Sequence, residues 1–154
     1  MLKVSAEAHL DIIGEGTEHK KLQRQIDDLQ LKHRVLLHGE KSRAEVRQFM
    51  QGADGYVLSS RHETFGNVLL EAMACGLPSV ATRCGGPEDI LLRPAIGLLC
   101  EPNDSDDLAA SINQMIGADW QSKKIRLEAV QRFSPKIFTE DMIRIYLSAA
   151  RGLT

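Results

Sequence analysis

Short apolar runs alternate with amphipathic stretches along this chain of 154 residues, and this alternation restricts the fold more than any other feature. The run Leu10 to Ile13 stops at Gly14-Glu15-Gly16, and apolar residues at helical spacing follow between Lys20 and Lys32. The run Arg34 to His38 also ends at a glycine, and Ser42 with Glu45 three residues later predicts a capping box that opens the next helix. The chain therefore predicts strands and helices in repeated succession.

The remaining segments repeat this order. Strands of this length with helices between them pair in parallel through right-handed crossovers. The sequence thus predicts an α/β fold, a three-layer doubly wound parallel sheet, which we expect residues 1–154 to form as one domain. The expected strands are 10–13, 34–38, 54–59, a stretch from after Pro78 through 82, and 96–100; the expected helices are 20–32, 42–50, 66–75, one that starts at Gly86-Pro87, 104–116, 120–133 and 138–150.

Composition excludes several classes of protein. Nineteen Lys plus Arg against 21 Asp plus Glu give a net charge of -2, which is too weak a field to favour nucleic acid as a partner. The three cysteines contain no CxxC pair, so a disulfide framework or a zinc site has little support. No apolar run approaches the ~20 residues that span a bilayer. We therefore expect a cytoplasmic protein, and leave open a peripheral membrane association of the full-length protein.

The loop after the third expected strand concentrates polar residues. Ligands of a doubly wound sheet bind outside the carboxyl ends of its strands, and residues 59–67 follow such an end. Gly66 and Asn67 lie where the next helix begins, so their N–H groups are unpaired within the helix and lie at the positive end of its dipole. This position suits a phosphate, and a glycine lets an anion approach closely.

Two glutamates bracket this expected phosphate site. Glu71 has apolar neighbours nearly all round its helix, which predicts a buried helix whose carboxylate needs hydrogen-bond donors such as the two hydroxyls of a ribose. Glu63 precedes the helix and projects from the strand end. A carboxylate at that point suits sugar hydroxyls or charge that develops during a reaction.

Glu63 and Glu71, with seven residues between them, resemble the E-x7-E signature of the family 4 retaining glycosyltransferases, which have the GT-B architecture. Phe65-Gly66 between the glutamates and the run from Glu71 to Pro78 are similar to the same motif. The resemblance covers nearly the whole chain, because further segments are similar as well: Ile12 to Gly16, Arg34 to Gly39, Ala53 to Leu58 and Gly85 to Ile90.

The resemblance implies that the chain is the nucleotide-sugar-binding C-terminal half of such an enzyme, which transfers a hexosyl group to an unknown acceptor. It implies that Glu63 is the catalytic residue and contacts the sugar of the donor substrate, and that Glu71 binds the ribose. The other binding residues that it implies are Thr64, Phe65, Gly66 and Asn67 for the diphosphate and sugar, His62 for the sugar, and Gly39 and Glu40 for the base.

The resemblance also sets expectations for partners and cofactors. The donor substrate is a UDP-, GDP- or ADP-linked sugar, and no metal is expected because helix N–H groups and basic side chains stabilise the leaving diphosphate. Family members carry an N-terminal Rossmann-like domain that binds the acceptor, followed by a first strand and helix with basic residues. This chain begins after both, so we expect it alone to bind a nucleotide sugar weakly and to transfer none.

Structural interpretations compete at several of these positions. Gly66 and Asn67 also fit an ordinary helix start, and Glu71 also fits a carboxylate that caps backbone amides. The run Asp104-Ser105-Asp106 resembles a D-x-D metal site, but an acidic helix cap, which the helix dipole favours, explains it better. His62 fits an exposed surface residue equally well.

Two other functions stay open for the chain. One is a nucleotide-sugar-binding module without catalysis, and the other is a GT-B relative such as a sugar-nucleotide epimerase or a phosphorylase. The spacing of the two glutamates favours the transferase.

Overall fold

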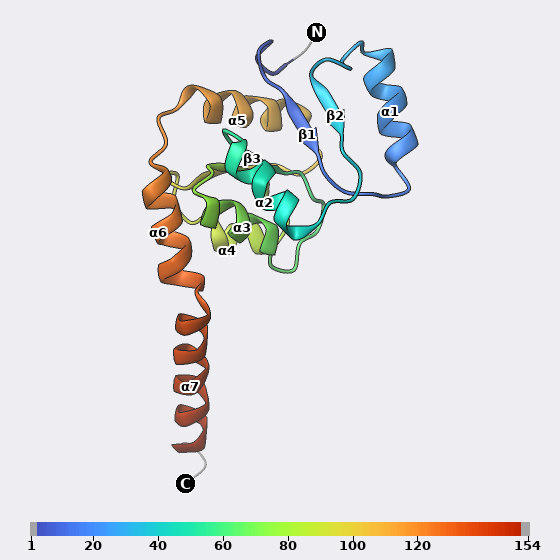
Figure 1. The fold of residues 1–154 in the computed structure, drawn as a ribbon. Coiled ribbons are helices and arrows are strands. Elements are labelled where there is room, and N and C mark those ends of the chain that lie inside the picture. Colours follow the sequence, from blue (N-terminus) through green and yellow to red (C-terminus); the bar gives the residue numbers. More distant parts are fainter. Residues whose placement is uncertain (1–2, 152–154) are drawn as a thin grey trace. The chain divides into compact units, whose positions relative to one another are not determined.

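The computed structural model describes residues 3–151, and the chain forms two compact units, residues 1–53 and 54–154. Both units alternate strands with helices, and the strand pairs in both are parallel (Figure 1). The predicted α/β class with parallel strands is confirmed. The described strands form a two-stranded sheet and a three-stranded sheet. The expectation of one domain over the whole chain stays a prediction.

The first unit has a thin core. Of its described hydrophobic side chains, only Ile26 and Met50 are buried, whereas Leu10 and Leu36 are 45% and 49% exposed. Strand register places Leu10 beside Val35. The elements of this unit are β1 (Leu10–Ile12), α1 (His19–Asp28), β2 (Val35–Leu37) and α2 (Arg43–Gly52).

The capping box predicted for the second helix is present at the start of α2. The Ser42 hydroxyl accepts a hydrogen bond from the Glu45 N–H at 3.3 Å, and the Glu45 carboxylate accepts one from the Ser42 N–H at 2.8 Å. Two backbone donors that the helix leaves unpaired are thereby satisfied. The boundary of α2 thus follows from local sequence.

The second unit contains a three-stranded sheet in the order β3-β4-β5, and the central strand β4 is wholly buried. A predicted cap also begins one of its helices, because the Asp104 carboxylate accepts hydrogen bonds from the N–H groups of Asp106 and Asp107 at 2.9 and 3.0 Å. Its elements are β3 (Tyr56–Leu58), α3 (Asn67–Cys75), β4 (Ser79–Thr82), α4 (Gly86–Ile90), β5 (Gly97–Cys100), α5 (Ser105–Gly117), α6 (Ser122–Phe133) and α7 (Pro135–Arg151).

Helices cover both faces of this sheet. Successive residues of a strand point to opposite faces, and in β4 the side chains of Val80 and Ala81 belong to different buried clusters. Val80 packs in a cluster with Met115 of α5, while Ala81 belongs to the larger cluster on α3, α4 and α6. The second unit therefore has the three layers that the sequence predicts. The larger cluster includes Leu58, Leu69, Met73, Ile90 and Ile125.

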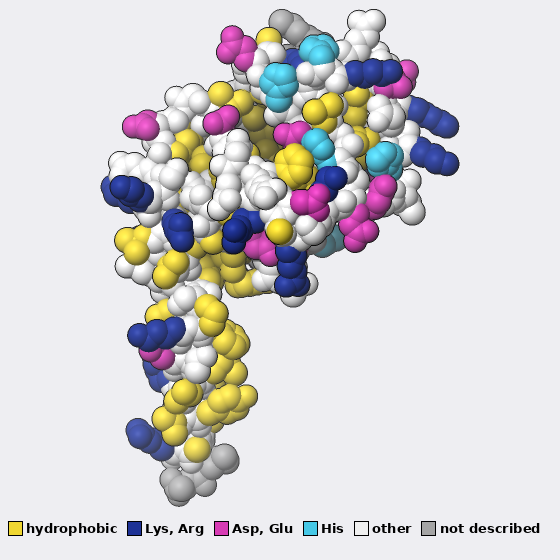
Figure 2. Space-filling view, in the orientation of Figure 1, with side chains coloured by type: hydrophobic (Ala, Val, Ile, Leu, Met, Phe, Trp, Pro, Cys, Tyr) yellow, Lys and Arg dark blue, Asp and Glu magenta, His cyan; other side chains and the backbone are white. Residues whose placement is uncertain are grey.

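The last helix, α7, projects away from the other elements of its unit (Figure 1). It begins at Pro135, three residues before the predicted start, because proline is tolerated in the first turn of a helix. Apolar side chains lie along one side of it (Figure 2), and Phe138, Ile145 and Tyr146 are each more than half exposed. Among residues 3–151, no helix has both the length and the apolar character that a bilayer span requires.

Candidate functional site

The loop between β3 and α3 carries Glu63. The main chain of Glu63 is hydrogen-bonded to the loop after β4. The Glu63 N–H donates to the carbonyl oxygen of Cys84 at 3.1 Å, and the Gly86 N–H donates to the carbonyl oxygen of Glu63 at 2.9 Å. These bonds form a parallel bridge beyond the ends of the two strands. The buried Thr82 hydroxyl donates to the carbonyl oxygen of Ser60. The position of Glu63 is thus set by the sheet.

Two glycines allow this close approach of the loops. A Cβ atom on Gly86 would lie 2.1 Å from the carbonyl oxygen of Phe65, and one on Gly85 would lie 2.6 Å from that of Glu63. Both distances are far shorter than a carbon atom tolerates, so any other residue at either position would push the loop of Glu63 outward.

The first turn of α3 follows directly. Gly66 is the N-cap with φ +94°, a left-handed conformation that glycine adopts without strain, and no side chain caps the helix there. The N-caps Ser42 and Asp104, by contrast, carry side chains that accept bonds from their own helices. The Leu69 N–H donates to the carbonyl oxygen of Gly66 at 2.9 Å, so the N–H groups of Asn67 and Val68, at the very start of α3, are left to an anion or to solvent.

The side chains of the loop differ in how firmly they are held. The Ser60 hydroxyl donates to Oε1 of the half-buried Glu63 at 2.9 Å. Phe65 is 41% exposed and contacts Phe133 of α6 edge to face, with ring centroids 6.0 Å apart and planes at 74°. The remaining predicted side chains of this loop, His62, Thr64 and Asn67, are exposed.

The prediction that its apolar neighbours bury Glu71 is wrong, because Glu71 is exposed. Only one side of α3 meets the core, through Leu69, Ala72 and Met73, while the apolar Val68 is 37% exposed beside Glu71 on the outer side. Burial therefore does not force Glu71 to have a partner. Its proposed ribose contact stays a prediction, and water can solvate its charge when no ligand is bound.

Tyr56 of β3 connects the two glutamates electrostatically and was not predicted as a site residue. Burial raises the pKa of the Tyr56 phenol, and the negative charges of Glu63 and Glu71 raise that pKa further. Both carboxylates therefore lie within Coulombic reach of one phenol. The signal available in the sequence was an aromatic residue with a polar tip in the strand that leads to the loop.

Gly39 and Glu40, predicted to border the base, belong to the first unit. Gly39 has φ +67°, and its carbonyl oxygen accepts a hydrogen bond from the Gly14 N–H at 2.8 Å. Glu40 is exposed. The structure brings the residues from His62 to Glu71 together in the second unit, and the contribution of Gly39 and Glu40 to that site stays a prediction.

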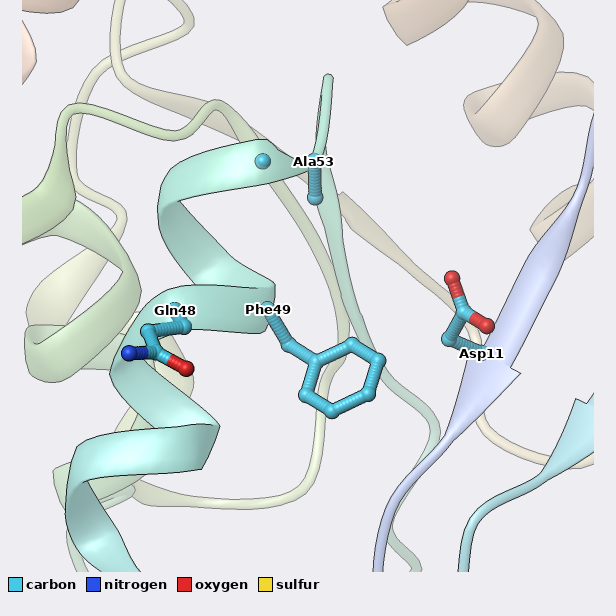
Figure 3. Close-up of a pocket in the computed structure, with 5 residues that line it drawn as sticks. Asp11, Gln48, Phe49 and Ala53 are labelled. Carbon is cyan, nitrogen blue, oxygen red and sulfur yellow. The ribbon is translucent and has the colours of Figure 1, made fainter.

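The first unit contains an open pocket of about 340 Å³ that none of the predicted site residues lines (Figure 3). Next to it, His38 Nε2 lies 2.6 Å from Asp11 Oδ1, and the His38 ring centroid lies 4.6 Å from that of Phe49. The sequence signal for this pair was a charged residue inside an otherwise apolar strand. The pocket is lined by Asp11, Gln48, Phe49, Gly52 and Ala53.

Sequence comparison relates the chain to proteins that transfer sugars. Residues 2–137 match the family described as Glycosyl transferases group 1. A relative named as the uncharacterized glycosyltransferase MJ1178, from Methanocaldococcus jannaschii, is 37% identical over 132 residues, which are 86% of this chain and 37% of that protein.

Structural comparison agrees. The lipopolysaccharide outer core galactosyltransferase WaaB in its apo form has a TM-score of 0.85 and 28% identity, over 95% of this chain and 42% of that one. Anabaena Alr3699/HepE, solved in complex with UDP and glucose, has a TM-score of 0.81 and 29% identity, over 96% of this chain and 42% of that one. Another structure of the Anabaena protein contains UDP-glucose.

The chain thus spans about two fifths of the length of these relatives. Its parallel α/β architecture matches the Rossmann-like domains of GT-B glycosyltransferases. Because the family match covers most of its length, the chain belongs to the family Glycosyl transferases group 1.

Proposed function

We propose that this chain is the donor-binding half of a retaining glycosyltransferase and holds a nucleotide-linked hexose for transfer to an acceptor. One observation carries the proposal: Glu63, whose main chain is hydrogen-bonded to Cys84 and Gly86, and Glu71 flank the start of α3, which no side chain caps. The UDP-glucose found in the Anabaena relative makes UDP-glucose the first ligand to test. GDP- and ADP-linked sugars are the alternatives.

The roles of the residues follow from their positions. The diphosphate binds at the first N–H groups of α3, where the helix dipole is positive and Gly66 presents no side chain. Glu63, whose main chain is bonded to Cys84 and Gly86, directs its carboxylate to the sugar, where positive charge develops during transfer. Glu71, which is exposed on α3, accepts hydrogen bonds from the ribose. These groups bind the donor substrate without a metal.

The acceptor belongs to a second, N-terminal domain in this proposal, and the reaction takes place between the two domains in the cytoplasm. Orientation of the acceptor against the donor sugar can lower the barrier by roughly 7–11 kcal/mol. A chain that positions only the donor substrate lacks that contribution. We therefore propose that the 154-residue chain binds a nucleotide sugar but transfers none by itself. A peripheral membrane partner for the full-length protein belongs to the same proposal.

Titration calorimetry of the chain with UDP, GDP, ADP and their glucose conjugates tests nucleotide binding. Glu71→Ala is expected to weaken binding of the preferred nucleotide by about 1–3 kcal/mol, the cost of losing one partner of a hydrogen bond. Glu140→Ala, which removes an exposed carboxylate from α7, is the matched control and should leave affinity unchanged. If a folded Glu71→Ala chain binds as tightly as its parent, Glu71 does not contact the ribose.

Glu63→Gln separates binding from catalysis. In the full-length protein it is expected to lower turnover of the nucleotide sugar far more than the affinity for the plain nucleoside diphosphate, because its proposed contacts are to the sugar and to charge in the transition state. Equal losses in both measurements would place Glu63 in the nucleotide pocket instead.

A further inference from the structure

Arg132, near the end of α6, holds the end of α4. Its Nη1 and Nη2 groups donate to the carbonyl oxygens of Ile90 and Asp89 at 2.9 and 2.6 Å. The last carbonyls of a helix have no partner within it, and a cation at that end is favourable for the helix dipole. The short helix α4 is therefore closed by a side chain from a residue 42 positions later in the chain.

The guanidinium is held on other sides as well. Arg132 Nη1 lies 3.5 Å from the Glu128 carboxylate, and the Arg132 guanidinium carbon lies 4.5 Å from the ring centroid of Phe133. Only 24% of the Arg132 side chain is exposed. A planar group with fixed partners in several directions has one defined orientation, which a flexible ammonium does not reproduce.

Two contacts connect Arg132 and Phe133 to the loop that carries Glu63. Through the first, Arg132 anchors the end of α4, and Gly86 at the start of that five-residue helix donates to the carbonyl oxygen of Glu63. Through the second, the ring of Phe133 packs edge to face on Phe65, two residues after Glu63. Glu63 and Phe65 of the loop are thus both supported from α6.

We propose that Arg132 and Phe133 form a positioning pair for the site of the donor substrate. They hold residues 63–65 in the conformation that presents Glu63 and the first N–H groups of α3, although neither is expected to touch the donor substrate. The part of this inference that concerns affinity rests on the proposed function, whereas the part that concerns the conformation of the loop does not.

A fluorine label on Phe65 tests the conformational part without any ligand. The chain is prepared with 4-fluorophenylalanine at position 65, and its ¹⁹F NMR signal is compared between the parent and variants of the pair. Phe133→Leu and Arg132→Gln are expected to shift or broaden the signal, and Phe133→Tyr, which keeps the ring, is expected to retain it. Arg126→Gln, an exposed position on the same helix, is the matched control.

Calorimetry with UDP-glucose on the unlabelled chains tests the link to the site. We expect Phe133→Leu and Arg132→Gln to weaken binding about 3- to 10-fold, the range for loss of one aromatic contact, and Phe133→Tyr to restore parental affinity. Arg132→Lys should recover only part of the loss, because one ammonium cannot reach both carbonyls in the same plane. Circular dichroism and Trp120 emission verify that each variant is folded.

The outcomes separate the two proposals. If folded variants keep both the parental fluorine signal and the parental affinity, the positioning pair is refuted. A changed signal with unchanged UDP-glucose affinity would also overturn the link between the pair and the site. If the signal changes as expected while the parent chain binds no nucleotide sugar, the positioning of the loop stands and the proposed function falls.

Discussion

The parallel sheets of the two units are stabilised in different ways. In the second unit, β4 lies between two strands, helices cover both faces, and all four residues of β4 are buried. In the first unit, β1 and β2 form a two-stranded sheet in which Leu10 and Leu36 are almost half exposed. Parallel sheets are stable when both faces are covered, so the second unit provides the firmer support.

Polar contacts link the segments around the two strands of the first unit. Arg34 donates to the carbonyl oxygens of Ala8 and Ser5, and His38 pairs with Asp11 across the two strands. A hydrogen bond contributes about 0.5–1.5 kcal/mol net, whereas one fully buried large apolar side chain contributes about 1.5–3 kcal/mol. Glu63 and Glu71 therefore belong to the unit with the larger buried core.

The largest expected effect comes from the core of the second unit. Leu69→Ala should lower its free energy of unfolding by about 2–5 kcal/mol, because Leu69 is fully buried and the substitution leaves a cavity. Trp120, the single tryptophan of the chain, lies in the same unit and reports the transition in urea by its fluorescence. Leu36→Ala in the first unit is the control and should leave this transition unchanged. A loss of stability below about 0.5 kcal/mol, which is typical of a surface substitution, would show that the second unit is not more tightly packed than the first.

Hydrogen exchange compares the sheets directly. Amides of β4 are expected to exchange at least about 100-fold more slowly than the paired amides of β1, because strands with few buried contacts open locally at low free energy. The measurement is amide exchange followed by NMR on the unmodified chain. Equal protection in the two strands would show that the first sheet is as firmly supported as the second, and the comparison would fail.

Alkaline pH should act on the second unit. The pKa of Tyr56 is raised above 10.0 by burial and by Glu63 and Glu71, so the folded state keeps the phenol proton more tightly than the unfolded state. Stability from this group is complete below pH 10 and is lost as pH rises through the folded pKa. Absorbance titration in a Tyr146→Phe background isolates Tyr56. Glu63→Gln and Glu71→Gln should each lower the pKa of Tyr56. If neither substitution changes that pKa, the charges of the two glutamates do not act on the phenol.

Acidic pH should act on the first unit. The hydrogen bonds of Glu45 with the Ser42 hydroxyl and then with the Ser42 N–H lower the pKa of Glu45 below 4.5. Stability from this cap is present above pH 4.5 and is lost as pH falls through the folded pKa. Amide signals of α2 followed by NMR during acid titration should therefore change in the parent and not in Glu45→Gln. If the amide signals of α2 change in the same way in the parent and in Glu45→Gln, the Glu45 cap is not the cause of the change.

The smallest expected change in stability comes from removing the Ser79 hydroxyl. The Ser79 hydroxyl on β4 is buried and has no hydrogen-bond partner among the described residues. Ser79→Ala should therefore be neutral or stabilise the second unit by up to about 1 kcal/mol, since it removes a buried polar atom whose desolvation is not compensated. Urea denaturation with Trp120 emission measures it. A clear loss of stability would reveal a partner for this hydroxyl.

Local features of the chain could be predicted because neighbouring residues decide them. The order of strands and helices follows from apolar periodicity, and the caps at Ser42 and Asp104 depend on residues within one helical turn. The loop that holds Glu63 and Gly66 was also predictable, because a strand must end and a helix begin between them. These features determine the α/β class and one end of the candidate site.

The surroundings of the side chains in that site depend on how the helices pack on the sheet. Whether Glu71 is buried depends on which side of α3 meets the core. The residues around Glu71 are apolar on nearly every side of the helix, so the sequence does not indicate which side that is. The effect of both glutamates on Tyr56 and the contact of Phe133 with Phe65 join residues from different elements. Such contacts arise when helices pack on a sheet, since packing selects partners by shape and distance rather than by position along the chain.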